Sequence, residues 1–379
     1  MLRVTSRIFF LFLFVFVFCV RAHSVHSGEI CKYSKPICDA RSVVFSISAF
    51  DPIASAVRIG RELLVASRHA IADEVEVRVE TKGNKLLIAE VVPTSYSGDI
   101  ILLKVPGLPD GPNLTLAKVN LGEEIFSIGT DVSRKNIRVY RPGKVMFLPP
   151  KGKPLARLHH DAYSQPGNSG GAVVNASGQL VGIVTSGGDG RYEAIPAQAI
   201  ESLQNQSGPR YRQVSMERGA AIRVCVLKLD EVRSKRRQKV TVEDIKAIAT
   251  SCPRSQNRQL IDLAAQTLGL AGHMENSIEM FEGSLEEDPN ALNSRIGLLV
   301  SLSLAGRYED SLPHLRWLLD NNVVDLQVLR LAIQSGVWGG DRVLAERAFL
   351  LLKKINPKIA PTAKRFLTSP PPRPKRQIR

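Results

Sequence analysis

Hydrophobic and polar positions change their period once along the chain, near residue 205. Between about residues 42 and 205, short apolar runs alternate with Gly, Pro, Asn and Asp, as is typical of β-strands joined by turns. The apolar runs lie at residues 42–48, 63–66, 75–79, 86–92, 100–105, 125–128, 137–140 and 180–185. Many short strands at regular spacing predict an all-β sandwich or barrel rather than a parallel sheet with crossover helices.

After residue 205 the pattern takes the period of α-helices, and from about residue 258 it repeats every 34 residues. Glycine, apolar and small residues recur at this interval: Gly272, Gly306 and Gly340; Phe281, Leu315 and Phe349; Ser277, Ser311 and Ala345. This spacing resembles that of tetratricopeptide repeats, in which each repeat is a pair of helices. We therefore expect tetratricopeptide-like repeats over residues 258–359, with an ordinary helical bundle as the alternative. Residues 206–257 then form a helical linker or capping helices.

The first residues have the pattern of an export signal. Arg3 and Arg7 precede an apolar run over residues 8–20, and Val20-Arg21-Ala22 ends it with a cleavage-like pattern. Thirteen apolar residues are fewer than the ~20 that span a bilayer comfortably. The sequence therefore predicts a cleaved signal peptide over residues 1–22 and a periplasmic or secreted protein. An uncleaved anchor is the alternative.

Four cysteines remain after the predicted signal peptide: Cys31, Cys38, Cys225 and Cys252. An even number of cysteines in an exported chain favours disulfides. We prefer the two local pairings, Cys31 with Cys38 in an extension over residues 23–41 and Cys225 with Cys252, although four cysteines allow three connectivities. None of them has the spacing of metal ligands, so we expect neither a metal nor a cofactor.

The formal net charge is +15, and part of it gathers in two basic runs. One run covers residues 233–239, and the other covers residues 364–379, which carry no acid. We interpret these runs as a solvated loop and a basic, proline-rich disordered tail over residues 360–379. Contact of the tail with an anionic membrane surface is an alternative. Nucleic acid is not an expected partner, because no nucleic-acid-binding motif accompanies the charge.

One short motif has the composition of a nucleophile turn: residues 167–171, of sequence GNSGG, stand before the β-like run AVV. Glycines allow the sharp bend that would leave the Ser169 side chain at the rim of a sheet. The backbone N–H groups of Gly167 and Ser169 can then point to one place, where a substrate carbonyl oxygen would gather negative charge.

A serine hydroxyl is a poor nucleophile without a base, and the base needs an orienting acid. His69 ends a strand-like segment and is the preferred base, whereas the remaining histidines are 23, 26, 159, 160, 273 and 314. Asp99 is the preferred acid because it precedes the apolar run at residues 100–105. The other candidate acids are Asp73, Asp131 and Asp161.

The order His69, Asp99, Ser169 resembles that of chymotrypsin-type serine peptidases, with the bacterial HtrA-type branch nearest. The resemblance rests on residues 65–69 (VASRH), 98–105 (GDIILLKV), 161–162 with 166–175, 178–183 (GQLVGI) and 194–196. It covers residues 42–205, less than half of the chain. It implies two six-stranded β-barrels with the active site in the cleft between them. Ser169 would attack the peptide carbonyl, His69 would transfer the proton and Asp99 would orient His69, with Gly167 and Ser169 forming the oxyanion hole.

The same resemblance indicates a pocket for the side chain that precedes the cut. Tyr163, six positions before Ser169, would form its base, and Thr185, Ser186 and Gly187 would form a wall. Because the base carries no aspartate, a preference for Lys or Arg is not expected. A modest uncharged side chain is the expected substrate residue.

Together these patterns predict an exported serine endopeptidase that acts on proteins or peptides. HtrA-type proteases usually carry a PDZ domain after the barrels, but here helical repeats occupy that place, and we expect them to bind a substrate or partner protein. The alternative is a catalytically silent binding module on a protease scaffold.

Overall fold

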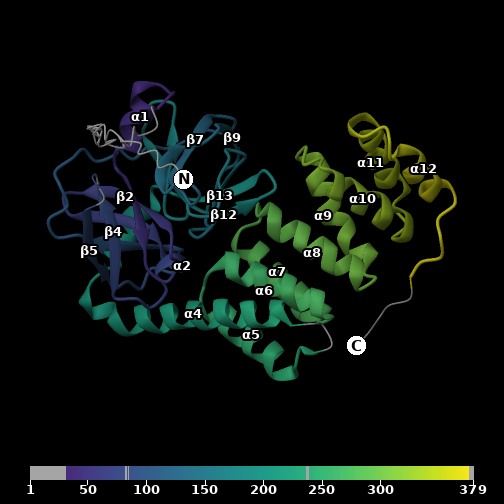
Figure 1. The fold of residues 1–379 in the computed structure, drawn as a ribbon. Helices are drawn as coiled ribbons and strands as arrows, with labels where there is room; N and C mark the ends of the chain where they lie inside the picture. Colours follow the sequence, from purple (N-terminus) through teal and green to yellow (C-terminus); the bar gives the residue numbers. More distant parts are fainter. Residues whose placement is uncertain (1–30, 82, 84, 236–238, 375–379) are drawn as a thin grey trace, which may run out of the picture. The chain divides into compact units, whose positions relative to one another are not determined.

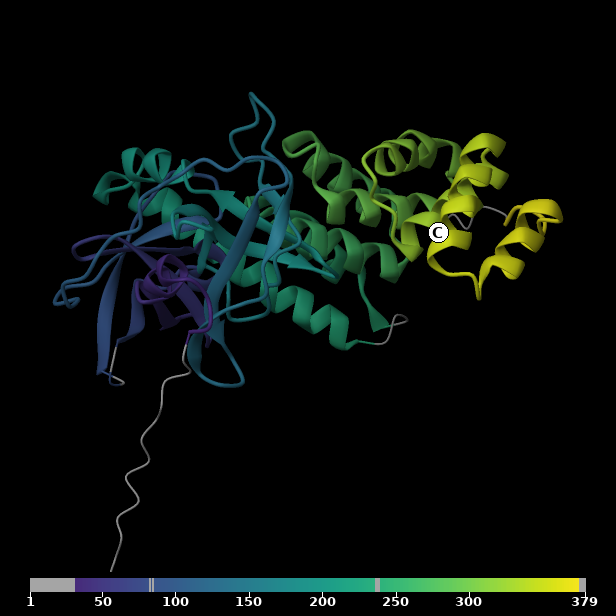
Figure 2. The same ribbon diagram turned by 90° about the horizontal axis from the view of Figure 1, so that it is seen from above.

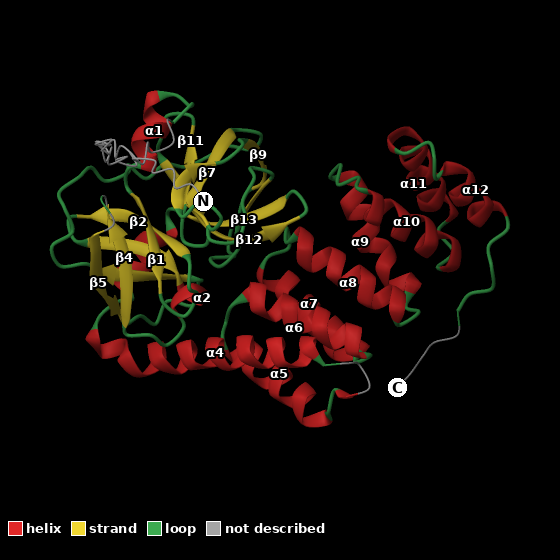
Figure 3. Cartoon of the chain, in the orientation of Figure 1, coloured by secondary structure: helices red, strands yellow, loops and turns green. Residues whose placement is uncertain are grey.

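The strands of the described chain all lie before about residue 200, and the part after it is helical (Figure 3). The computed structural model describes residues 31–81, 83, 85–235 and 239–374. The predicted signal peptide at residues 1–22 lies outside these described residues. None of the helices in the described residues combines the length and the apolar character that a membrane span requires.

Six strands of the described chain close into a first barrel in the order β1-β2-β3-β6-β5-β4 (Figure 1). Their bounds are Val44–Ser48 (β1), Ala54–Gly60 (β2), Leu63–Ser67 (β3), Glu76–Thr81 (β4), Lys85–Val92 (β5) and Ile100–Lys104 (β6). Every pairing in this barrel is antiparallel. Aliphatic side chains such as Ile47, Leu64 and Leu103 fill its interior.

The second sheet has the strand order β11-β12-β13-β10-β9-β7-β8, and an additional β11–β7 pairing joins it into a ring. Its strands are Glu124–Asp131 (β7), Asn136–Val139 (β8), Gly143–Phe147 (β9), Leu158–His160 (β10), Ala172–Asn175 (β11), Leu180–Gly188 (β12) and Arg191–Pro196 (β13). β8 lies outside the ring and pairs with β7. The two-barrel fold that the sequence predicted is therefore confirmed.

Three helix pairs follow each other with the 34-residue period of the sequence (Figure 2). They are Arg258–Ala271 with Met274–Glu287 (α6, α7), Leu292–Leu304 with Tyr308–Asp320 (α8, α9), and Leu326–Trp338 with Arg342–Ile355 (α10, α11). The turn glycines Gly272, Gly306 and Gly340 all have positive φ, at 103°, 70° and 83°. The predicted glycine period therefore marks a left-handed turn that glycine adopts without strain.

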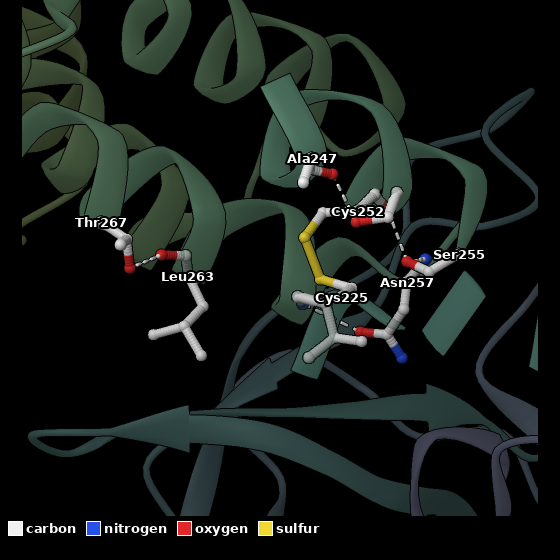
Figure 4. The surroundings of a disulfide bond; sticks show 9 residues. Cys225, Ala247, Cys252, Ser255, Asn257, Leu263 and Thr267 are labelled. Carbon is white, nitrogen blue, oxygen red and sulfur yellow. Dashed lines mark hydrogen bonds between the residues drawn. A yellow bond between two sulfur atoms is a disulfide. The ribbon is translucent and has the colours of Figure 1, made fainter. Parts of the chain in front are cut away.

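Two further helices stand between the barrels and these pairs. Short elements, Ala199–Asn205 (α3) and Pro209–Tyr211 (η1), lead into Arg212–Ser234 (α4) and Val242–Arg254 (α5). A disulfide joins Cys225 of α4 to Cys252 of α5, close to the start of α6 (Figure 4). Cys31 and Cys38, of which the latter lies in Lys35–Arg41 (α1), are also disulfide-bonded.

The C-terminal segment departs from the disordered tail expected over residues 360–379. Residues Ala360–Thr368 form a helix (α12), because Leu367 is buried and Phe366 packs against Trp338. Beyond α12, the Arg373 guanidinium lies over the Tyr308 ring and pairs with Glu309. The prediction of disorder was wrong for residues 360–368, since proline content hid an apolar helical face.

α4 packs directly on Arg68–Ile71 (α2), the short helix that follows β3. The backbone of the two elements is close enough that a Cβ at Gly219 would lie 2.3 Å from the carbonyl oxygen of Ala72. Arg68 is 1% exposed, and its Nη2 donates to the carbonyl oxygen of Ser215 at 2.6 Å. The first barrel and the helical region therefore share a buried contact.

A buried ionic cluster connects the second barrel to the helix pairs. We call Arg157, His159, Glu193, Arg258 and Asp288 the junction cluster. Glu193 Oε2 lies 2.8 Å from Arg157 Nη1 and 2.7 Å from Arg258 Nη2, and Asp288 Oδ2 lies 2.9 Å from His159 Nε2. Each of the five side chains is at most 5% exposed. Burial alone would raise the pKa of Glu193, but the charges of Arg258 and Arg157 hold it well below its usual value.

Two glycines in helices allow a matched test of the contact between α4 and α2. Glycine-to-alanine changes in a helix normally stabilise it by up to about 1 kcal/mol. We expect this gain for Gly283→Ala in α7, where an added Cβ has nothing within 4 Å. Gly219→Ala should instead lower the free energy of unfolding by about 1–3 kcal/mol, because its Cβ would overlap Ala72. Chemical denaturation of both variants measures the two signs, and equal stabilisation would contradict the contact.

Candidate active site

The turn that carries Ser169 can be built only with glycine at two of its positions. Gly167 and Gly170 have φ values of +93° and +83°. A Cβ on Gly170 would lie 2.1 Å from the Ser55 carbonyl oxygen. β2 also holds the turn in place, because Ser55 N donates to the Ser169 carbonyl oxygen and Ser55 Oγ donates to the Gly167 carbonyl oxygen, at 2.8 and 2.7 Å. The turn is therefore fixed by the first barrel while it belongs to the second.

The backbone N–H groups of Gly167 and Ser169 are the expected oxyanion donors. Among hydrogen bonds between described residues, neither of these N–H groups is a donor. The neighbouring N–H groups are used within the protein: Asn168 N donates to Gln165 O, and Gly170 N donates to Val184 O. The turn thus satisfies its other amides and leaves these two for a further acceptor.

His69 and Asp99 are joined twice by hydrogen bonds. His69 Nδ1 lies 2.6 Å from Asp99 Oδ2, and the His69 backbone N–H donates to Asp99 Oδ1 at 2.9 Å. The Asp99 side chain is 1% exposed and that of His69 is 12% exposed. His69 lies in α2 just after β3, and Asp99 lies just before β6. The two residues are close because Ser67 at the end of β3 pairs with Ile100 at the start of β6. Sheet register therefore brings together two residues that are thirty positions apart in the sequence.

The surroundings of this pair favour a charged carboxylate and a basic imidazole. Burial alone would lower the pKa of His69, but the charge and hydrogen bond of Asp99 raise it above 6.5. Burial alone would raise the pKa of Asp99, but His69, Arg157 and the Thr185 hydroxyl lower it to about 2. The Thr185 hydroxyl donates to Asp99 Oδ2 at 2.6 Å. Thr185, predicted only as a pocket wall, is thus also the partner of the buried acid.

Ser169 and His69 line one cleft of about 620 Å³. Tyr163, Thr185, Ser186 and Gly187, the residues expected to form the specificity pocket, line the same cleft. Tyr163 is 38% exposed, and the centroid of its ring lies 6.0 Å from that of the Tyr192 ring. The structure therefore brings the candidate nucleophile, base and pocket residues to one place.

Two features of the cleft were missed by the sequence analysis. Asp51 also lines it, and the pKa of this carboxyl is raised because burial outweighs the opposing effect of His69. The helical region forms part of the wall, through Val226, Leu229 and Asp230 of α4 and Gln259, Leu260 and Leu263 of α6. No short motif in the sequence signals this wall, because it depends on how distant segments pack.

His159, His160 and the other candidate acids make structural contacts, whereas His23 and His26 lie outside the described residues. His159 belongs to the junction cluster, and His160 is fully buried against Tyr192, where burial lowers its pKa to about 4. Asp73 pairs with Arg223, Asp131 accepts from Ser133 and Arg138, and Asp161 accepts from Lys144 N. Within the described ranges, no group of three or more His, Cys, Asp or Glu side chains is arranged to hold a metal ion.

Comparison with known proteins places the barrels in a recognised class. Residues 54–183 match the family model of the trypsin-like peptidase domain. The chain is 30% identical over 162 residues to "Serine protease HTRA1B" of Danio rerio. The aligned residues make up 39% of this chain and 33% of the relative. It is 31% identical over 159 residues to "Probable periplasmic serine endoprotease DegP-like" of Pseudomonas putida, covering 38% and 32%. Residues 54–183 are therefore similar to trypsin-like peptidase domains, and the chain is similar to serine proteases of the HtrA-like type.

The match is limited in extent. The chain spans about a third of the length of the curated relatives it matches. Among solved structures, the inactive form of the Rv3671c protease of M. tuberculosis is 21% identical with a TM-score of 0.40, covering 45% of this chain and 91% of that one. The family match ends at residue 183, so α4–α12 lie outside it.

Removing the charge of Asp99 should reverse the direction of the His69 pKa shift. In the unaltered chain we expect the imidazole to titrate above 6.5. In Asp99→Asn the burial remains while the attracting charge is lost, so the pKa should fall below that of the unaltered chain by at least about one unit. Histidine NMR titration measures both values. Asp310→Asn, at an exposed carboxyl on α9, is the control and should leave the His69 pKa unchanged. An equal pKa in Asp99→Asn would contradict the coupling.

Proposed function

We propose that this chain is a serine endopeptidase that hydrolyses peptide bonds with Ser169 as nucleophile, His69 as general base and Asp99 as orienting acid. One observation carries the proposal: Ser169 lines the same cleft as a histidine that is bonded at 2.6 Å to a buried aspartate. The trypsin-like peptidase match over residues 54–183 supports it.

The chemistry follows from the roles that these groups can take. His69 Nδ1–H bonds to Asp99, which leaves Nε2 to accept the Ser169 proton as the hydroxyl attacks the substrate carbonyl carbon. The N–H groups of Gly167 and Ser169 would stabilise the negative oxygen of the tetrahedral intermediate. His69 then returns the proton to the leaving amine, and water hydrolyses the acyl-enzyme by the same route. No metal or cofactor is required for these steps.

The proposed substrate residue before the cut is uncharged and of modest size. Tyr163 is proposed as the base of the pocket and Thr185, Ser186 and Gly187 as its wall, which is supported by their position in the lining of the cleft. The Thr185 hydroxyl donates a hydrogen bond to Asp99, and the Ser186 hydroxyl donates one to Glu193. The rings of Tyr163 and Tyr192 both line this cleft, and we expect them to limit the room for a large side chain.

We further propose that the protein is exported and that α6–α11 are tetratricopeptide-like repeats that bind protein. The Cys225–Cys252 disulfide supports export, because disulfides persist in oxidising compartments. The Pseudomonas putida relative is named as a probable periplasmic endoprotease, which points the same way. The repeats are supported by helix starts that recur every 34 residues, at 258, 292 and 326.

Replacement of the nucleophile separates the enzyme from the alternative of a catalytically silent binding module. Ser169→Ala should lower turnover of a protein substrate on the order of a millionfold and leave the melting temperature unchanged. A fluorophosphonate probe should label the unaltered chain and Ser177→Ala, a change at an exposed turn serine, but not Ser169→Ala. Absence of labelling in the folded unaltered chain would favour the silent module.

The pH dependence of kcat/KM should report the His69 pKa. The base must be neutral to accept the Ser169 proton, so activity is lost as pH falls through that pKa. Because the pKa is raised, we expect the midpoint of this loss to lie above 6.5. Initial rates at low substrate concentration, measured in constant-ionic-strength buffers, give the profile. A rate that stays constant down to about pH 5 would exclude His69 as the base.

A further inference from the structure

A second cavity of about 420 Å³ adjoins the candidate active-site cleft. The two share five lining residues, namely Ser186, Gly187 and Gly188 at the end of β12 and Gln259 and Leu263 on α6. Cleft and cavity therefore adjoin at the end of β12 and the start of α6. The second cavity then extends along the helix pairs, where α8 and α10 supply further lining residues.

The cavity is lined by equivalent positions of successive repeats. Gln259, Asn293 and Gln327 are each the second residue of the first helix in a pair, 34 positions apart, and all three line the cavity. Leu270 and Leu304 are likewise 34 apart, both line it, and their side chains are 67% and 51% exposed. The repeat thus presents apolar side chains and side-chain amides on one surface. Such amides both donate and accept hydrogen bonds, as a peptide backbone does.

The amide at the boundary with the cleft has unused bonding capacity. Gln259 Oε1 is buried and has no hydrogen-bond partner among the described residues. Asn293, by contrast, is already engaged, since its Oδ1 accepts from Arg191 Nε and its Nδ2 donates to the Arg191 carbonyl oxygen. A buried acceptor without a donor costs free energy, which a bound N–H group would offset.

The end of β12 offers an edge for an extended chain. β13 pairs with β12 as far as Gly188, whereas β11 pairs only with residues 180–183 of β12. In the part of the chain that the structure describes, no strand covers the other edge of residues 186–188. An extended peptide adds to such an edge through backbone hydrogen bonds. Ser186 and Gly187 wall the pocket for the residue before the cut, so the peptide here is the one on the N-terminal side of the cut.

We propose that the helix pairs extend the substrate-binding site of the peptidase. The substrate segment on the N-terminal side of the scissile bond lies extended along Ser186–Gly188 and continues into the second cavity. There Gln259 bonds its backbone, and Leu270 and Leu304 contact its apolar side chains. This inference rests on the proposed endopeptidase function. The occupant is an unfolded polypeptide stretch with apolar residues several positions before the cut.

Matched peptide substrates test the direction of the groove. Three substrates are compared. The first is a short fluorogenic peptide taken from a site that the full chain cuts in unfolded casein. The other two carry about ten additional residues of alternating Leu and Ser, at the N-terminus in one and at the C-terminus in the other. Ten extended residues span roughly 33 Å. The N-terminal extension should raise kcat/KM about tenfold or more, mainly through KM, and the C-terminal extension should not. Equal cleavage of the three peptides by the unaltered chain would overturn the proposal.

Surface leucines supply the variant and its control. The double variant Leu270→Asp/Leu304→Asp should remove the gain from the N-terminal extension and leave cleavage of the short peptide within about twofold. Val343→Asp/Leu350→Asp changes two α11 side chains that are 79% and 64% exposed and lie outside the cavity lining, and it should keep the gain. A gain retained by the first variant would overturn the proposal.

A binding measurement separates failure of the groove from failure of the proposed enzyme. Fluorescence anisotropy measures the binding of the dye-labelled, N-terminally extended peptide to the Ser169→Ala chain, and this binding needs no turnover. Its Kd should rise at least about tenfold in Ser169→Ala with Leu270→Asp/Leu304→Asp. Binding without any cleavage by the unaltered chain would reject the peptidase and keep the groove. If sedimentation shows that the leucine changes dissociate a dimer, the face is a contact between copies and the proposal is rejected.

Discussion

The junction cluster is the interaction on which the arrangement of barrels and helices depends. Its five ionisable side chains come from two strands, a loop and the ends of two helices, and each is at most 5% exposed. A buried charge is tolerated only when opposite charges and hydrogen bonds surround it. Glu193 and Asp288 therefore require Arg258 in one position, and Arg258 is the first residue of α6. The charges fix where the helix pairs begin relative to β13.

The same cluster reaches the cleft. Ser186 accepts a hydrogen bond from Arg157 and donates one to Glu193, so a wall residue of the pocket is tied to the ions that hold α6. Arg157 also acts on the charge balance of His69 and Asp99. On the opposite side, α4 supports the α2 segment that carries His69. The helical region is thus a structural part of the cleft rather than an appendage that is joined only through the backbone.

Local patterns in the sequence were sufficient for an all-β first half and for the repeat period, because both follow from hydrophobic periodicity and glycine placement. The division of the strands into two barrels was expected only from the resemblance to a known family. β2 escaped the strand prediction, since its first residues, Ala54, Ser55 and Ala56, are small and carry little β-propensity. They are small because the Ser169 turn packs against this strand. The pairing of His69 with Asp99 was predictable from order and context. The contacts of Thr185 with Asp99, and of α6 with the cleft, depend on packing between distant segments that no local pattern encodes.

The Cys225–Cys252 bond anchors α4, the helix whose N-terminal half packs on the segment that carries His69. Oxidation of these thiols ties that helix to α5 by a covalent link in addition to its packing. A newly made chain in a reducing compartment lacks the tether, and the backing of His69 then relies on noncovalent contacts alone. Through this one helix, disulfide formation is linked to the rigidity of the segment that carries His69.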